Sequence, residues 1–249
     1  SWDDKQEVTW EAYRIIKGVW ANPHFDYQGK FFKVKDAELS IPLVQKPHPP
    51  FWMPTRSPES VAAAATEGFS TVQWCPPKMD VVREIFDYYR EVRHRAKPQA
   101  RKPHIALMRE IYVAESDRQA LEESKEHWIY FWNRVGGGRA YGGYANENLA
   151  SITREERKKE LLDVDFSIRD NSFICGSPET VTRQIKEIAT QAGADCFLGE
   201  FTFGALEHDK VMKSLRLFTE QVMPELKKFE TDALNYPNNG YRVWLKSRP

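Results

Sequence analysis

The residues whose types and spacing best suit a chemical task are Arg56, Ser57 and Ser60, which together could bind a phosphate. Ser57 precedes Pro58 and Glu59, and this order predicts a helix that starts at Pro58 with Ser57 as its N-cap. The exposed N–H groups of a helix start attract anions, and the arginine and two hydroxyls add charge and donors. The alternative is that the serines only cap the helix. We favour phosphate binding, because a strand is expected just before, which puts the helix start where ligands bind in α/β folds.

A second helix start has nearly the same sequence. Ser177-Pro178-Glu179-Thr180 repeats the serine, the proline and the acidic residue of the first. It lacks an adjacent cation and follows a segment without a clear pattern. We therefore predict that this second motif is a structural cap and nothing more.

Trp74 is expected at the end of a strand, directly before Cys75-Pro76-Pro77. Core packing is the common fate of a tryptophan. The functional alternative is an aromatic wall at the mouth of a pocket, because the last residue of a barrel strand faces the site. Cys75 has no base beside it in the sequence, so we do not assign it as a nucleophile.

Arg109 and Glu110 are charged residues within an otherwise apolar segment that is expected to be a strand. The alternation of a strand puts them on opposite faces. Because a buried charge is costly unless it is paired, a structural ion pair is the favoured explanation. A Glu110 that faces the pocket is the less favoured alternative.

The elements that must position these residues alternate between strands and helices. Strands are expected at 51–56, 69–74, 104–113 and 195–201, and helices at 58–67, 79–96, 117–132, 178–192 and 207–228. This order predicts an α/β fold with a parallel sheet covered by helices. A helix at 5–20 and a hairpin that turns at Gln28-Gly29 come first. Residues 133–172 are expected to form an irregular insertion, and residues 230–249 an extended tail.

The composition of the chain argues against several classes of protein. The 249 residues contain 36 Lys+Arg and 36 Asp+Glu, and this balance argues against binding to nucleic acid or to an anionic membrane. No run approaches the roughly 20 apolar residues of a membrane span, and there is no leader pattern. Three widely spaced cysteines argue against a disulfide framework, so a cytoplasmic protein is expected. The histidines lack the spacing of a metal site.

The number of strands decides between two architectures. The length suits a complete (βα)8 barrel of about 250 residues, but only four strand–helix units are found. A small doubly wound domain is possible, and half of a barrel is favoured because the chain starts on a helix without a preceding strand. We therefore expect a chain that is shortened at its N-terminus.

Several stretches together resemble the bacterial luciferase-like flavin-dependent monooxygenases. They are Trp20 with 25–32, the run 42–52, the segment 57–68, and 176–181 with 193–195. The resemblance covers residues 1–229 and implies a (βα)8 TIM barrel of which this chain supplies the last four units. Its implied cofactor is reduced FMN used with dioxygen, or F420 in one branch of the family.

The resemblance also implies roles for particular residues and partners. Arg56, Ser57 and Ser60 would contact the flavin phosphate, and Trp74 would lie near the flavin ring and the substrate. The family's catalytic histidine belongs to the first half of the barrel, so no catalytic residue is assigned. The implied partners are a small organic substrate, dioxygen, a flavin reductase and a second copy of the chain. The alternatives are a non-catalytic flavin-binding relative and an F420-dependent oxidoreductase.

Overall fold

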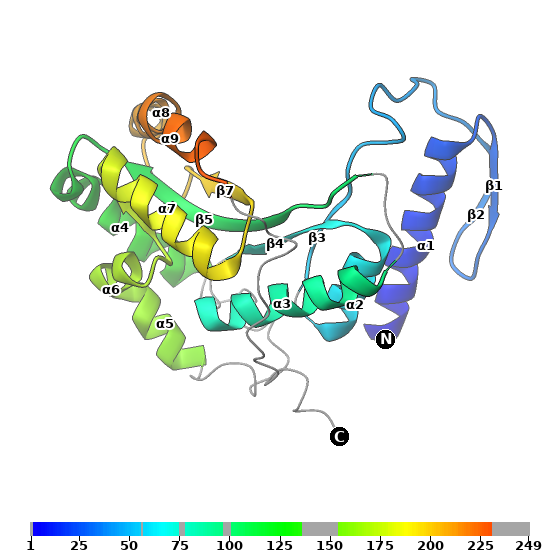
Figure 1. The fold of residues 1–249 in the computed structure, drawn as a ribbon, viewed down its shortest axis with the longest axis horizontal. Coiled ribbons are helices and arrows are strands. Elements are labelled where there is room, and N and C mark those ends of the chain that lie inside the picture. Colours follow the sequence, from blue (N-terminus) through cyan, green and yellow to red (C-terminus); the bar gives the residue numbers. More distant parts are fainter. Residues whose placement is uncertain (1, 56, 75–77, 97–100, 136–153, 231–249) are drawn as a thin grey trace. The chain divides into compact units, whose positions relative to one another are not determined.

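The structure, a computed structural model, divides into two compact units, residues 1–51 and residues 52–249 (Figure 1). It describes residues 2–55, 57–74, 78–96, 101–135 and 154–230. Arg56, Cys75, part of the predicted insertion (136–153) and the predicted tail from residue 231 onward lie outside the described residues.

The first unit is a helix with a hairpin. Helix α1 spans Trp2–Ala21, and the antiparallel strands β1 (Phe25–Gln28) and β2 (Lys33–Ala37) follow, as expected. The carboxylate of Glu11, in the middle of α1, accepts hydrogen bonds from the backbone N–H groups of residues 30–32 at 2.7–3.1 Å. These bonds hold the hairpin turn against the helix.

The second unit is built on a parallel sheet. Its strands β3 (Trp52–Pro54), β4 (Ser70–Trp74), β5 (Ile105–Val113) and β7 (Cys196–Glu200) are neighbours in that order. These are the four strands that the sequence predicts. A short strand that the sequence did not reveal, β6 (Ile174–Gly176), pairs in parallel with the end of β5. Three residues are too few to display a strand period.

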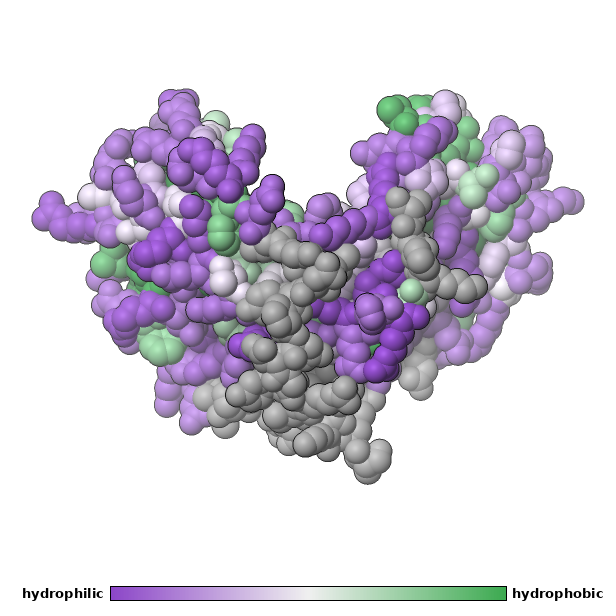
Figure 2. All heavy atoms as spheres, in the orientation of Figure 1, coloured by the Kyte–Doolittle hydropathy of each residue, from purple (hydrophilic) through white to green (hydrophobic). Residues whose placement is uncertain are grey.

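The expected helices are present and lie beside the sheet in Figure 1. They are α2 (Pro58–Glu67), α3 (Met79–Arg95), α4 (Asp117–Val135), α7 (Pro178–Ala192), and a last segment made of α8 (His208–Leu217), the π-helical η2 (Phe218–Val222) and α9 (Met223–Lys227). Helices α2 and α7 both end at a glycine in the left-handed conformation, Gly68 (φ 74°) and Gly193 (φ 63°). The surface over α7 is mostly hydrophilic (Figure 2), as expected for the outer side of a helical layer.

The prediction of an irregular insertion is wrong for its second half, which contains α5 (Arg154–Leu162) and α6 (Val164–Arg169). Arg157 is buried, and its guanidinium bonds Ser172 Oγ at 2.6 Å, Asp170 at 2.9 Å and Glu160 at 2.9 Å. Polar contacts of this kind take the place of an apolar stripe on α5. A search for apolar periodicity therefore misses this helix.

The two faces of the sheet differ in exposure. Register pairing puts Trp52, Trp74, Met108, Glu110, Leu198 and Glu200 on one face and Thr71, Gln73, Ile105, Leu107 and Arg109 on the other. The second face is buried, and Arg109 contacts Met79 at the start of α3 there. On the first face Trp52 and Leu198 are each 39% exposed. The face that carries Trp74 and Glu110 is therefore the one a ligand can approach.

Candidate functional site

The start of α2 is the predicted phosphate site, and it lies at the carboxyl end of β3. Ser57 is the N-cap, and it exchanges bonds with Ser60: Ser57 N–H donates to Ser60 Oγ (3.0 Å) and Ser60 N–H to Ser57 Oγ (3.3 Å). The Ser60 hydroxyl also donates to the Ser57 carbonyl at 2.8 Å. The Ser57 hydroxyl reaches Ser60 Oγ at 3.4 Å, the longest of these contacts. Of the two hydroxyls, that of Ser57 is the freer to turn toward an anion.

The start of α7, which has nearly the same sequence, is filled by a carboxylate of the chain itself. Asp117, the first residue of α4, accepts hydrogen bonds from Ser177 N–H (2.6 Å) and the Thr180 hydroxyl (3.0 Å). Burial alone would raise the pKa of Asp117, but these hydrogen bonds outweigh it and hold the pKa below its usual value. The predicted cap is confirmed, because Ser177 is the N-cap of α7 and its side chain accepts a hydrogen bond from Thr180 N–H. A second anion at this helix start would meet the charge of Asp117.

Trp74 is the last residue of β4, and it is half-buried. Its indole stacks on that of Trp132 from α4, with ring centroids 5.6 Å apart and planes 18° apart. Strands β3 and β4 are parallel neighbours, so Ser57, after β3, and Trp74 lie at the same edge of the sheet. One side of the indole packs in the interior, and its remaining exposure leaves it available to a ligand. Core packing and a pocket wall are thus both compatible with its position.

Glu110 lies next to Trp74 on the same face, and it is fully buried. Its Oε1 accepts a hydrogen bond from Trp74 Nε1 at 2.9 Å, and its Oε2 has no hydrogen-bond partner within the described part of the chain. Burial, the largest cause, raises the pKa of Glu110 to about 8, and the charge of Glu200 on β7 adds to the rise. The carboxyl is therefore mainly protonated at neutral pH.

The favoured sequence explanation of Glu110, a structural ion pair, is wrong. Over the residues that the structure describes, Glu110 makes no ion pair, and its side chain accepts a hydrogen bond from Trp74. Arg109 points to the opposite face, where it donates to the carbonyls of Met108 (2.7 Å) and Gln73 (3.3 Å). A carboxyl that stays neutral needs no cation, and this is why the pairing rule for buried charges does not apply.

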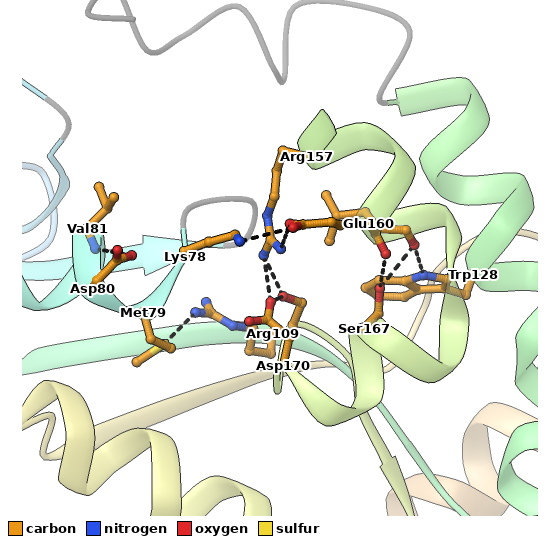
Figure 3. Close-up of polar contacts among 12 residues, drawn as sticks. Lys78, Met79, Asp80, Val81, Arg109, Trp128, Arg157, Glu160, Ser167 and Asp170 are labelled. Atoms are coloured by element: carbon orange, nitrogen blue, oxygen red, sulfur yellow. Dashed lines mark hydrogen bonds and ion pairs between the residues drawn. The ribbon is translucent and has the colours of Figure 1, made fainter. Parts of the chain in front are cut away.

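An ion pair joins helix α5 of the insertion to Lys78, the residue before α3. Figure 3 shows Lys78 and Arg157 both pointing to Glu160 of α5, and Lys78 Nζ lies 3.0 Å from its carboxylate. Trp128 of α4 donates from Nε1 to the carbonyl of Leu161 at 2.6 Å. Sequence reasoning missed these contacts, because Lys78 and Glu160 are 82 positions apart and neither belongs to a motif.

An open groove of about 730 Å³ lies between α7 and the η2–α9 segment. It is lined mainly by polar side chains of helix surfaces, such as Thr182, Lys186 and Gln221. It contains neither the candidate phosphate site nor Trp74 or Glu110. The candidate site at the carboxyl ends of β3 and β4 is therefore distinct from this groove.

Comparison with known proteins gives a family match over most of the chain. Residues 1–196 match the family model of luciferase-like monooxygenases. An uncharacterized protein of Sinorhizobium fredii, y4wF, is 24% identical over 217 residues, which are 86% of this chain and 59% of that protein. The chain thus spans less than two thirds of the length of this relative.

Several solved structures are similar to the chain in fold. The monooxygenase RslO1 from Streptomyces bottropensis has a TM-score of 0.67 at 20% identity, with 90% of this chain and 62% of that chain covered. The oxygenating constituent of 3,6-diketocamphane monooxygenase from Pseudomonas putida, in complex with FMN, has a TM-score of 0.63 at 19% identity (88% and 63% covered). The coenzyme F420-dependent tetrahydromethanopterin reductase from Methanopyrus kandleri has 0.60 at 16% identity (87% and 62% covered).

Proposed function

The chain belongs to the luciferase-like monooxygenase family, whose fold is the (βα)8 barrel, and we propose that it functions in a flavin-dependent monooxygenase. The reaction would use reduced FMN and dioxygen to oxygenate a small organic substrate. One observation supports the proposal most. The start of α2, which can bind an anion, and the half-buried indole of Trp74 lie at the same edge of the sheet. The FMN complex of a monooxygenase with this fold supports the choice of cofactor.

The residues at this edge fit the two chemical parts of FMN. The start of α2 would hold the phosphate through the Ser57 hydroxyl and Arg56, with Ser60 keeping the cap in shape. This differs from the start of α7, where Asp117 would repel a phosphate. The Trp74 indole would contact the flat ring and exclude water from one side of it. When bound, reduced FMN supplies the electrons for the reduction of dioxygen.

The partners follow from the same proposal. Reduced FMN would be delivered by a separate flavin reductase. Within the described residues β3 pairs only with β4 and β7 only with β5, so the sheet has two open edges. Open edges favour pairing with another strand, and we propose that a second copy of the chain takes part in the assembly.

A second candidate function is F420-dependent hydride transfer, which the similarity to an F420-dependent reductase favours. Titration of the chain with FMN and F420 in parallel distinguishes the two. Saturable binding of F420 without binding of FMN would replace our first choice with the second.

Ser57→Asp is expected to weaken the binding of FMN by about tenfold or more, which corresponds to about 1.4 kcal/mol. Aspartate is as good an N-cap as serine, so α2 stays intact, but its charge repels the phosphate. The affinity for riboflavin, which has no phosphate, should be unchanged. Fluorescence titration with both flavins measures the two dissociation constants.

The matched control is Ser57→Asn, which also caps the helix and has nearly the shape of aspartate without its charge. It should bind FMN within about threefold of the wild type. Equal FMN affinities for the aspartate and asparagine variants would contradict a phosphate at this helix start. So would an equal loss of riboflavin binding, because that would point to a distorted helix.

A further inference from the structure

We propose that Glu110 is the positioning residue that fixes the indole of Trp74 at the edge of the sheet where the ligand binds. This inference rests on the proposed function only in that Trp74 is taken to contact the ligand. Glu110 itself is fully buried, so it acts through Trp74 and does not touch the ligand.

Two contacts together fix the ring. Stacking on Trp132 defines the plane of the Trp74 indole but lets it slide and turn within that plane. The hydrogen bond from Nε1 to Glu110 Oε1, at 2.9 Å, removes that freedom because it anchors one edge of the ring. The partly exposed side of the indole is then presented in a single orientation. Pre-ordering of this kind spares a ligand the entropic cost of ordering the ring itself.

A purely structural role explains Glu110 poorly. A buried polar group in a core normally satisfies all of its hydrogen-bonding atoms, yet Oε2 of Glu110 has no partner among the described residues. Leucine would fill the same strand position without this cost. The hydrogen bond to Trp74 is what a glutamate adds there.

The groups around Glu110 determine its charge. Glu200 is its register partner on β7, Trp74 faces it from β4, and Arg109 precedes it on β5 but points to the other face. Trp132 of α4, which stacks on Trp74, is uncharged. Burial first, and then the charge of Glu200, raise the pKa of Glu110 to about 8. Because Oε1 accepts the indole N–H, the proton belongs on Oε2.

Loss of that proton should strengthen the hold on the ring. An ionised acceptor makes a shorter and stronger hydrogen bond than a neutral one, and the bond from Trp74 accordingly favours the charged form of Glu110. The indole is therefore held by a neutral hydrogen bond below about pH 8 and by a charge-assisted one above it. Glutamine keeps an acceptor oxygen at the same place and cannot titrate.

The test is the indole N–H resonance of Trp74 in ¹⁵N-tryptophan-labelled chain, assigned by its loss in Trp74→Phe and followed from about pH 6 to about pH 9. In the wild type the resonance should move downfield with a midpoint near pH 8, as expected for a strengthened hydrogen bond. In Glu110→Gln it should not move, because the amide oxygen does not titrate. Glu200→Gln should lower the midpoint, because it removes a negative charge that favours the protonated form.

Binding gives a second readout. Glu110→Leu should weaken riboflavin binding about tenfold, whereas Glu110→Gln should stay within about twofold of the wild type. The pH-dependent part of the proposal is overturned if the Trp74 resonance is insensitive to pH in the wild type, and the positioning itself is overturned if the glutamine and leucine variants bind alike. Should the leucine variant fail to fold, the resonances of the two glutamine variants decide. A wild type that binds no flavin but shows the predicted titration would contradict the proposed function alone.

Discussion

Trp128→Ala is expected to lower the free energy of unfolding by about 3–5 kcal/mol, the range for loss of a buried aromatic side chain. The Trp128 side chain is fully buried and stacks on Phe173 with ring centroids 4.3 Å apart. Its Nε1 donates to the carbonyl of Leu161 on α5, so alanine also removes a hydrogen bond that joins α4 to α5. Urea unfolding followed by circular dichroism measures the change.

Two further variants serve as controls for Trp128→Ala. Tyr130→Ala lies on the same helix at a side chain that is 49% exposed, and should change the free energy by no more than about 0.5 kcal/mol. Trp128→Phe keeps a ring but leaves the Leu161 carbonyl without its donor, and should have an intermediate effect. A loss below about 1 kcal/mol in Trp128→Ala would contradict the packing of α5 on α4.

The stability of the wild type should fall, relative to Glu110→Gln, as the pH rises from about 5 to about 8. In the unfolded chain Glu110 loses its proton near pH 4.5, whereas in the folded chain it keeps the proton up to about pH 8. The folded state therefore binds more protons in this interval, and its stability decreases with pH by up to about 1.4 kcal/mol per unit. Below the interval both states are protonated, and above it both are ionised, so the difference levels off.

Thermal or urea unfolding of both variants across this pH interval measures the difference, and titrating groups that do not interact with Glu110 cancel in the comparison. Glu122→Gln, an exposed carboxylate on α4, is the control, and it should follow the wild type. A constant difference between wild type and Glu110→Gln would mean that Glu110 ionises normally in the folded chain. That result would also remove the pH-dependent part of the positioning proposal.

Local patterns in the sequence were sufficient for the main strands and helices. The Ser-Pro-Glu order predicts the starts of α2 and α7, and glycines predict their ends, because caps depend on neighbouring residues only. Helix α5 was not predicted, because Arg157 binds polar partners where an apolar stripe would be expected. Strand β6 was not predicted, because it is only three residues long.

The candidate site could be predicted only where it depends on one segment. Ser57 and Ser60 were found from their own neighbourhood, and their role as flavin contacts stays a prediction, as does that of Arg56, which lies outside the described residues. The partnership of Glu110 with Trp74 joins positions 36 apart, and it depends on strand register, which the sequence does not reveal. For the same reason the carboxylate that fills the start of α7 could not be identified from Ser177 alone.

The dissociation constant of reduced FMN, measured without oxygen and compared with that of reduced riboflavin, tests the central claim most directly. If the carboxyl edge of the sheet holds a flavin by its phosphate and its ring, both should bind saturably. FMN should bind at least about tenfold more tightly than riboflavin, because the start of α2 adds charge-assisted hydrogen bonds to the phosphate. Equal affinities would contradict the phosphate site, and an absence of saturable binding of either flavin would contradict the flavin site as a whole.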